Sequence, residues 1–180
     1  MKFEKHEIQG VYLIKPELFS DSRGKFRRHF DLDQFMAEGI ESKIINANIS
    51  ENPNKFTLRG FHYQIGEYAE AKTLSCLVGE IYDVVVDLRP NSPTYKQWIS
   101  FYLNSENRFS IHVPAGCANA FLTTTENSLI HYYVSNSYQP EYEKGIRYDD
   151  PSFSFNWPNP PVYISDKDLN HPNYSDNSIR

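Results

Sequence analysis

The residue types best suited to chemistry in this chain stand together in one short apolar run, Leu58-Arg59-Gly60-Phe61-His62. Arginine offers a planar fork of donors that suits a phosphate, and histidine has the side-chain pKa nearest neutrality, which suits a general base. On a regular strand, Arg59 and His62 would face opposite sides because three positions separate them. A shared site therefore needs a bend or bulge, which we expect at Gly60. Without it, the run is a half-buried strand with the arginine outside and the histidine inside.

A metal site is the first alternative use for the histidines. The chain has six of them, at positions 6, 29, 62, 112, 131 and 171. No two have the short spacing of a ligand motif, and the residue two positions after His62 is Gln64, a poor ligand. We therefore expect no catalytic metal and no cofactor, and chemistry by proton transfer.

Short apolar runs separated by turn residues predict the elements that position these groups. We expect strands at 10–15, 26–30, 44–49, 57–64, 73–78, 80–89, 97–103, 109–113, 118–124 and 128–135, and one short helix from 31 to about 39. This spacing is typical of a sandwich or barrel, so the predicted fold is mainly β, an antiparallel jelly-roll barrel with one or a few short helices. In the very apolar 80–89 run, the carboxylate of Asp83 must be paired or functional.

The length of 180 residues suits a single domain, 1–180. Residues 139–180 hold many prolines and polar residues, and we expect them to form an irregular tail that wraps the same domain. From about His171 onward we expect the tail to be disordered.

Charge and hydropathy exclude two classes of partner. The net charge of −5 argues against a broad nucleic-acid footprint, and no apolar run approaches the ~18 residues of a membrane span. The charged start of the chain lacks the hydrophobic region of a signal peptide. The only cysteines, Cys76 and Cys117, are too few for a disulfide scaffold and are expected to be reduced and buried. The expectation is a soluble cytoplasmic protein.

The run from Leu58 to Gln64 resembles the LRGxHYQ signature of the dTDP-4-dehydrorhamnose 3,5-epimerase family. Further matches to the family follow in order at 21–26, 79–89, 92–95, 113–116, 145–151 and 164–168. The resemblance implies a cupin-like enzyme without a metal that inverts C3 and/or C5 of a nucleotide-linked 4-keto sugar through an enolate. It also implies a role in making a sugar of a cell-surface polysaccharide.

The resemblance implies roles for individual residues. His62 would be the base and Asp168 the carboxylate that orients it. Asp83 is the fallback independent of the resemblance, because an aspartate that lines the barrel could also reach the ring. Lys72 would stabilise the enolate, and Tyr132 would be the acid on the opposite face of the sugar.

Substrate-binding positions also follow from the resemblance. Arg23 and Arg59 match positions near the diphosphate, and Phe26 matches a residue that packs against the base. The remaining matches are Asn48 and Ser50, which are polar binding positions, and Tyr138, which would orient the sugar. In relatives the segment from Arg23 to Arg28 reaches into the neighbouring subunit, so a homodimer is implied.

Two departures leave the substrate open. Asn119 replaces a family histidine after the Pro-x-Gly turn, and an amide cannot carry a proton as an imidazole does. Arg28 stands where many relatives have an acid near the base. The nucleotide, the sugar and the inverted carbon therefore remain open. Alternatives are a single-centre epimerase or ketoisomerase, a non-catalytic sugar-nucleotide-binding protein, and a metal-dependent oxygenase.

Overall fold

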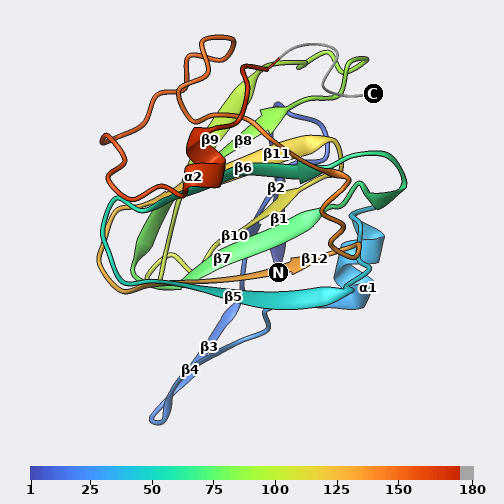
Figure 1. The fold of residues 1–180 in the computed structure, drawn as a ribbon. Helices are drawn as coiled ribbons and strands as arrows, with labels where there is room; N and C mark the ends of the chain where they lie inside the picture. Colours follow the sequence, from blue (N-terminus) through green and yellow to red (C-terminus); the bar gives the residue numbers. More distant parts are fainter. Residues whose placement is uncertain (175–180) are drawn as a thin grey trace.

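Two antiparallel β-sheets face one another in a computed structural model that describes residues 1–174 (Figure 1). The six-stranded sheet has the order β1-β2-β10-β7-β12-β5. Its strands are β1 (Lys2–Lys5), β2 (Tyr12–Lys15), β5 (Asn46–Asn52), β7 (Lys72–Val78), β10 (Ser110–Val113) and β12 (Ser128–Val134).

The five-stranded sheet has the order β13-β6-β11-β8-β9. Its strands are β6 (Leu58–Gln64), β8 (Glu80–Asp87), β9 (Trp98–Asn104), β11 (Cys117–Thr123) and β13 (Glu143–Gly145). Between β5 and β8, and again from β10 to β13, successive strands alternate between the two sheets. This crossing is the jelly-roll arrangement, and it places side chains from neighbouring stretches of sequence on facing walls. Within the described residues, the two sheets remain separate rather than joining into one closed ladder.

The strand residues alternate between two surroundings, as the pleat requires. In β8, Ile81 and Val85 point into the core between the sheets, whereas Tyr82, Val84 and Val86 point to the outer face. Residues 146–174 cover that outer face with Ile146, Phe153 and Tyr174 and with partly buried aromatic rings. Both faces of the five-stranded sheet are therefore buried, which explains why every residue of β8 except Glu80 is buried.

A third apolar cluster lies on the outer face of the six-stranded sheet. There α1 (Leu32–Ala37) packs Phe35 against Tyr12 and Tyr133. Asp31 caps this helix by accepting a hydrogen bond from the backbone N–H of Gln34 at 3.1 Å. The helix expected from 31 to about 39 is confirmed.

A hairpin of β3 (Leu18–Asp21) and β4 (Gly24–Arg27) projects away from both sheets (Figure 1). The expected strand at 26–30 is therefore displaced, because β4 starts at Gly24 and ends at Arg27. Three apolar side chains of the hairpin, Leu18, Phe19 and Phe26, are 41–65% exposed. The hairpin has no core of its own to cover them.

The C-terminal segment contains two short elements that the sequence did not predict, β13 and α2 (Asp166–Leu169). The disorder expected from about His171 is wrong for the last four described residues. The backbone N–H of Tyr174 donates to Asp150 at 2.6 Å, and its ring is buried. The rest of that expectation falls on residues 175–180, outside the described part of the chain. No helix within residues 1–174 is long and apolar enough to cross a membrane.

Candidate active site

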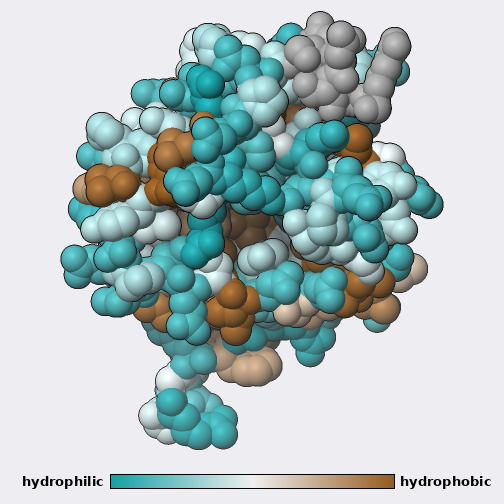
Figure 2. Space-filling view, viewed as in Figure 1, coloured by the Kyte–Doolittle hydropathy of each residue, from teal (hydrophilic) through white to brown (hydrophobic). Residues whose placement is uncertain are grey.

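The space between the two sheets opens as a cavity of about 370 Å³. Figure 2 shows this face of the molecule hollowed between the sheets, with hydrophobic residues deep in the hollow. The polar residues that line the cavity are Ser50, Glu51, Arg59, His62, Lys72, Asn119 and Tyr132. An adjoining cavity of about 430 Å³ shares His62, Lys72 and Tyr132 and adds Asn48, Glu70, Tyr138 and Glu143. Eight of the sequence-predicted site residues thus meet here from both sheets, namely Asn48, Ser50, Arg59, His62, Lys72, Asn119, Tyr132 and Tyr138.

A bulge in β6 brings Arg59 and His62 to the same cavity, as expected from the sequence. His62 pairs with Asn119 of β11 and Arg59 pairs with Phe121, so three positions on β6 match two on β11. Gly60, between them, has φ +111°, and a Cβ there would lie 2.7 Å from the Cα of Ala120. Only glycine fits this position, because both the backbone angle and the close approach exclude a side chain.

His62 is paired with a buried carboxylate. Its Nε2 lies 2.7 Å from Oδ1 of Asp168, which is 4% exposed on α2. The Ser165 hydroxyl caps α2 by accepting from the Asp168 N–H at 3.1 Å, and the Gly60 N–H donates to the second carboxylate oxygen at 3.3 Å. Burial alone would raise the pKa of Asp168, but the hydrogen bond from His62 holds it below its ordinary value. An ionised Asp168 therefore fixes the orientation of the imidazole.

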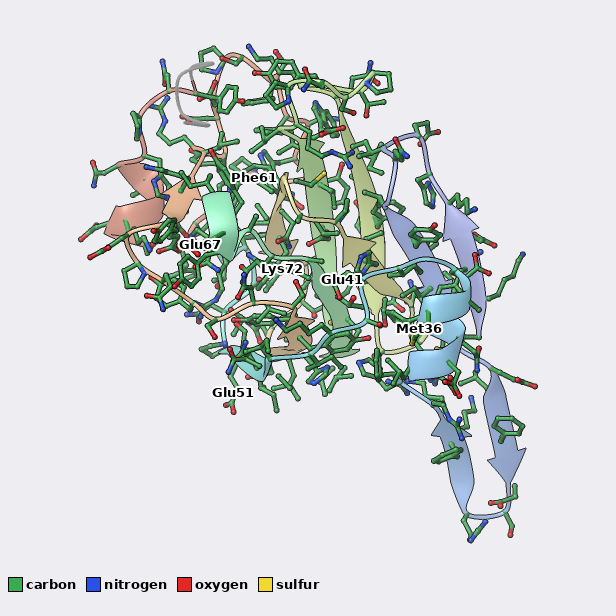
Figure 3. The ribbon with its side chains drawn as sticks, turned by 90° about the vertical axis from the view of Figure 1, so that its right-hand side faces the viewer. Met36, Glu41, Glu51, Phe61, Glu67 and Lys72 are labelled. Carbon is green, nitrogen blue, oxygen red and sulfur yellow. The ribbon has the colours of Figure 1, made fainter. Side chains whose placement is uncertain are left out.

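Lys72 starts β7 on the opposite sheet and reaches across to β6. Its ammonium donates to the His62 carbonyl at 3.2 Å and lies 3.3 Å from the carboxylate of Glu70. Figure 3 places Lys72 near the centre of the molecule. Glu70 also accepts from Gln64 at 3.0 Å, so this buried carboxylate is fixed on two sides. The site thus holds an oriented cation beside the imidazole.

Tyr132 lines the same cavity from β12, on the wall that faces His62. Burial raises its pKa, although the nearby Arg59 partly offsets this effect. The phenol therefore keeps its proton at neutral pH. Tyr138 lies at the edge of the adjoining cavity and donates to Glu143 at 2.7 Å.

Asn119 and Asp83 form a pair in the five-stranded sheet. The Asn119 amide donates to Asp83 Oδ1 at 3.3 Å, whereas Asp83 Oδ2 is buried and has no hydrogen-bond partner among the described residues. Burial raises the pKa of Asp83 to about 8, against the opposing effects of Asn119 and Lys72. Asp168 contacts the imidazole, so the fallback role of Asp83 as orienting carboxylate is not needed.

The remaining predicted binding residues divide into two groups. Arg59 lies in the cavity, where its Nε donates to the buried Asn52 side chain at 2.7 Å. Arg23 and Phe26 lie on the β3–β4 hairpin, where Arg23 pairs with Asp21, and Arg28 pairs with Asp31. Within one chain, none of these three lines the cavity.

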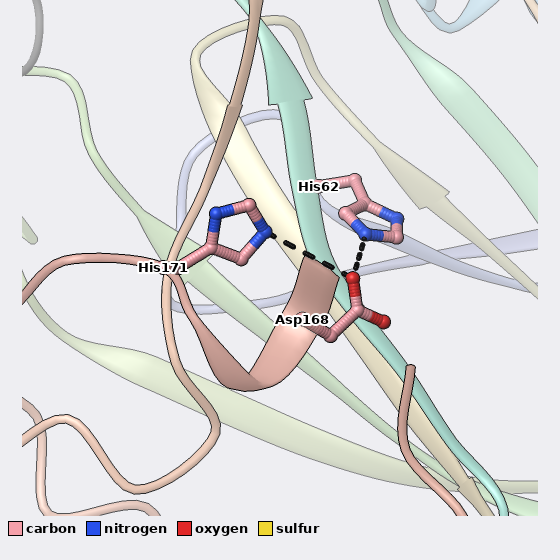
Figure 4. A group of neighbouring side chains, drawn as sticks. All are labelled: His62, Asp168 and His171. Carbon is pink, nitrogen blue, oxygen red and sulfur yellow. Dashed lines mark hydrogen bonds and ion pairs between the residues drawn. The ribbon is translucent and has the colours of Figure 1, made fainter. Parts of the chain in front are cut away.

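Three residues near the site were not predicted. Glu70 lies beside the ammonium of Lys72 and Glu143 accepts from the Tyr138 hydroxyl, and their only sequence signal is a carboxylate a few positions from each partner. The third is His171, whose Nε2 lies 3.9 Å from Asp168 Oδ1. His62, Asp168 and His171 together could hold a metal ion, since one donor atom of each lies within 4.8 Å of the others (Figure 4). Spacing in the sequence places His171 near Asp168, three positions away, but places neither of them near His62.

A jelly roll whose cavity holds an imidazole–carboxylate pair, an ammonium and a phenol on facing walls defines a sugar epimerase of the cupin-like class. Residues 5–176 match the family described as dTDP-4-dehydrorhamnose 3,5-epimerase, and the chain belongs to that family. It is a nucleotide-sugar epimerase of sugar biosynthesis.

Individual relatives agree with this family. The dTDP-4-dehydrorhamnose 3,5-epimerase of Sinorhizobium fredii is 36% identical over 96% of this chain and 89% of its own. The crystal structure of the Bacillus anthracis epimerase with TDP and PPi bound has a TM-score of 0.92 and 32% identity, covering 95% of this chain and 98% of that one. A 3'-monoepimerase from Streptomyces bikiniensis in complex with dTDP-quinovose has a TM-score of 0.86 and 29% identity, covering 93% and 85%.

Proposed function

We propose that this enzyme inverts C3 and/or C5 of a nucleoside-diphosphate 4-keto sugar, with His62 as base and Tyr132 as acid. The observation that carries the proposal is their placement on facing walls of one cavity. Inversion removes a proton from one face of the sugar and returns one to the other face, so it needs two proton carriers on opposite sides. With Nε2 held by Asp168, Nδ1 is the nitrogen of His62 that accepts the proton.

A base alone does not suffice for this reaction. A C–H acidity of about 19 and an imidazole pKa near 6.5 differ by about 12 units, or roughly 17 kcal/mol. Lys72 supplies the missing stabilisation in this proposal, because its ammonium can donate to the oxygen on which the enolate charge develops. The chain thus offers a base, a cation and an acid, and the reaction needs no further cofactor.

The substrate class follows from the cations and from the relatives. Arg59 in the cavity suits a diphosphate, and TDP and dTDP-quinovose occupy the solved relatives named above. We propose that the projecting β3–β4 hairpin carries Arg23 and Phe26 into the site of a second copy, which makes the enzyme a homodimer. The exposed apolar side chains of the hairpin support this proposal, since a partner would cover them. Asn48, Ser50 and Tyr138 would contact the sugar or nucleotide.

A single-centre epimerase is the second candidate, because one relative is a 3'-monoepimerase and because Asn119, whose amide cannot carry a proton, stands where the family has a histidine. We place the enzyme in the cytoplasm, since both cysteines are free and buried, as suits a reducing compartment.

Deuterium exchange tests the roles of the two proton carriers. Purified variants are mixed with NDP-4-keto sugars in D2O, and NMR locates the incorporated deuterium. His62→Asn should abolish both exchange and inversion, because no enolate forms. Tyr132→Phe should keep exchange at one carbon and lose inversion by about 10²–10⁴-fold, the usual effect of a positioned acid. Wild-type inversion by Tyr132→Phe, or wild-type exchange by His62→Asn, would show that the roles are wrong.

A further inference from the structure

His171 is an imidazole beside the catalytic pair with no use in the mechanism. Its Nε2 is buried and makes no hydrogen bond to any described residue. It faces Asp168 Oδ1 at 3.9 Å, which is too long for a hydrogen bond. Figure 4 shows the two imidazoles on either side of the Asp168 carboxylate. A buried nitrogen with a free lone pair or proton costs stability unless something binds it.

The chain makes room for this ring. Gly145 of β13 pairs with His62 of β6, and a Cβ on Gly145 would lie 2.0 Å from the His171 Nε2. The ring therefore occupies the space that any other residue at 145 would fill. Tyr174 fixes the segment that follows, through its bond to Asp150. His171 is thus packed next to the catalytic pair.

We propose that His62, Asp168 and His171 form an inhibitory binding site for zinc or a similar transition-metal ion. Two imidazoles and one carboxylate are a donor set that zinc accepts, with an open position for water. At bond lengths of about 2.0–2.2 Å, tetrahedral ligand atoms lie roughly 3.4 Å apart. The observed separations of 2.7 Å and 3.9 Å lie on either side of this value, and all three donor atoms lie within 4.8 Å of one another, so side-chain shifts of about 1 Å complete the site.

The surroundings fit such a site. Asp168 is 4% exposed and its other oxygen accepts from the Gly60 N–H, which orients the carboxylate as the outer contacts of a metal ligand do. Both thiols of the chain lie elsewhere, and burial raises their pKa values to about 12, so they do not compete as thiolates.

Metal binding would inactivate His62 as a base by moving the proton of its imidazole from Nε2 to Nδ1. In the proposed mechanism neutral His62 carries its proton on Nε2, directed at Asp168, and accepts at Nδ1. A metal takes the Nε2 lone pair, so the ring's single proton moves through solvent to Nδ1. The nitrogen that faces the substrate is then already protonated. Asp168, ionised beforehand, exchanges its hydrogen bond for a metal bond, and no redox step is involved.

The test is calorimetric titration of Zn²⁺ into chelator-treated protein, in parallel with epimerase assays. We expect one ion per chain and loss of activity with the same midpoint. His171→Asn should weaken zinc binding and inhibition about 10-fold or more, as loss of a ligand does, while its activity without metal stays within about two-fold of wild type. His6→Asn is the matched control, because its Nε2 is also buried and unpartnered, while among the described residues His6 faces a single carboxylate, Glu7, and belongs to no group of three metal-ligand donors. It should bind zinc as wild type does.

Zinc affinity unchanged in His171→Asn, or no zinc binding in the wild type, would overturn the proposal. The inhibition rests on the proposed function, but the binding does not, and the two can fail separately. Zinc binding that requires His171, in a protein that Zn²⁺ activates, would keep the metal site and refute the metal-free mechanism. Full activity after chelation, together with zinc binding that is equal in His171→Asn and wild type, would refute the metal site and keep the metal-free mechanism.

Discussion

At the scale of single residues, the site depends on charges held in defined states by burial. Asp83 and Asp87 lie on the same face of β8 and are both fully buried, yet their pKa values move in opposite directions. Burial raises the pKa of Asp83 to about 8. Burial also opposes the ionisation of Asp87, but hydrogen bonds from Arg89, Ser92 and Thr94 lower its pKa to about 2. One carboxyl is therefore neutral and the other ionised at pH 7.

This contrast predicts a pH-dependent effect of Asp83→Asn. Between about pH 4 and pH 8 native Asp83 keeps a proton that the unfolded chain has lost, so this group lowers the free energy of unfolding as pH rises, by at most about 1.4 kcal/mol per unit. Asp83→Asn removes this pH-dependent decrease. The free energy of unfolding of the variant, relative to that of wild type, should therefore rise between pH 5 and pH 8. Urea unfolding at several pH values measures the difference.

Asp87→Asn provides the control for this measurement. Its native pKa of about 2 and the ordinary value both lie below the tested range. The stability that ionised Asp87 contributes is therefore fully present across the range and is lost only in acid. Asp87→Asn should lower the free energy of unfolding by the same amount at every pH tested. A constant difference between wild type and Asp83→Asn as well would show that Asp83 is ionised in the folded protein.

Lys72 and Glu70 predict a graded loss of activity. Lys72→Met removes the proposed cation at the enolate and should lower kcat about 10²–10³-fold with little change in KM, as loss of a charge-stabilising donor does. Glu70→Gln keeps the ammonium but weakens its anchor, so a loss of roughly 10-fold is expected. Steady-state kinetics check both values. A larger loss for Glu70→Gln than for Lys72→Met would mean that Glu70 acts on the substrate itself.

At the scale of elements, the bulge at Gly60 decides whether Arg59 and His62 share a site. Gly60→Ala would force a Cβ against the Ala120 backbone at a positive φ and should destabilise the protein by about 2–5 kcal/mol. Gly24→Ala is the control, because Gly24 also has a positive φ but nothing within 4 Å of the added Cβ. It should cost only about 1–2 kcal/mol. Urea unfolding followed by circular dichroism compares them, and equal losses would contradict the role of the close approach.

The core strands were predictable because apolar runs and turn residues mark them directly. The bend at Gly60 was predictable too, since glycine stands between two residues that must face one cavity. Five short elements were missed, one of them the 3-10 helix η1 (Gly66–Tyr68). Lys2–Lys5 and Leu18–Asp21 carry too few apolar residues for a periodic signal. The short elements β13 and α2 are held by contacts with distant β6, β13 by strand pairing and α2 by the hydrogen bond from the Gly60 N–H to Asp168.

The site residues that local sequence patterns did not predict are those that contact the site from distant parts of the chain. Asp168 could be chosen only through family resemblance, because 106 positions separate it from His62. His171 lies three positions after Asp168, so its place beside that pair follows only once Asp168 itself is placed. By contrast, Arg59 and His62 stood out by residue type, although a half-buried strand remained the alternative until the family resemblance favoured a site. The alternation of strands between the sheets places Lys72 and Tyr132 opposite them.

At the scale of the whole molecule, the proposed homodimer predicts complementation between inactive subunits. Arg23→Ala removes a residue that serves the neighbour's site, whereas His62→Asn disables the chain's own site. Mixing the two variants should restore one competent site in each mixed dimer, because one cavity then has both His62 and the partner's Arg23. Activity assays after subunit exchange measure the recovery.

Each variant mixed with itself under the same conditions is the control. Mass spectrometry of differently labelled subunits shows whether mixed dimers form. If they form but have no more activity than either parent, the shared site is contradicted.

The projecting β3–β4 hairpin also makes catalysis depend on protein concentration. If each cavity needs Arg23 and Phe26 from a second chain, an isolated subunit lacks part of its substrate contacts, and the fraction of complete sites follows the law of mass action. Specific activity should then fall on dilution below the dissociation constant and recover on concentration, with a lag set by the rate of re-association. The cell would have a working enzyme only above a threshold level of expression.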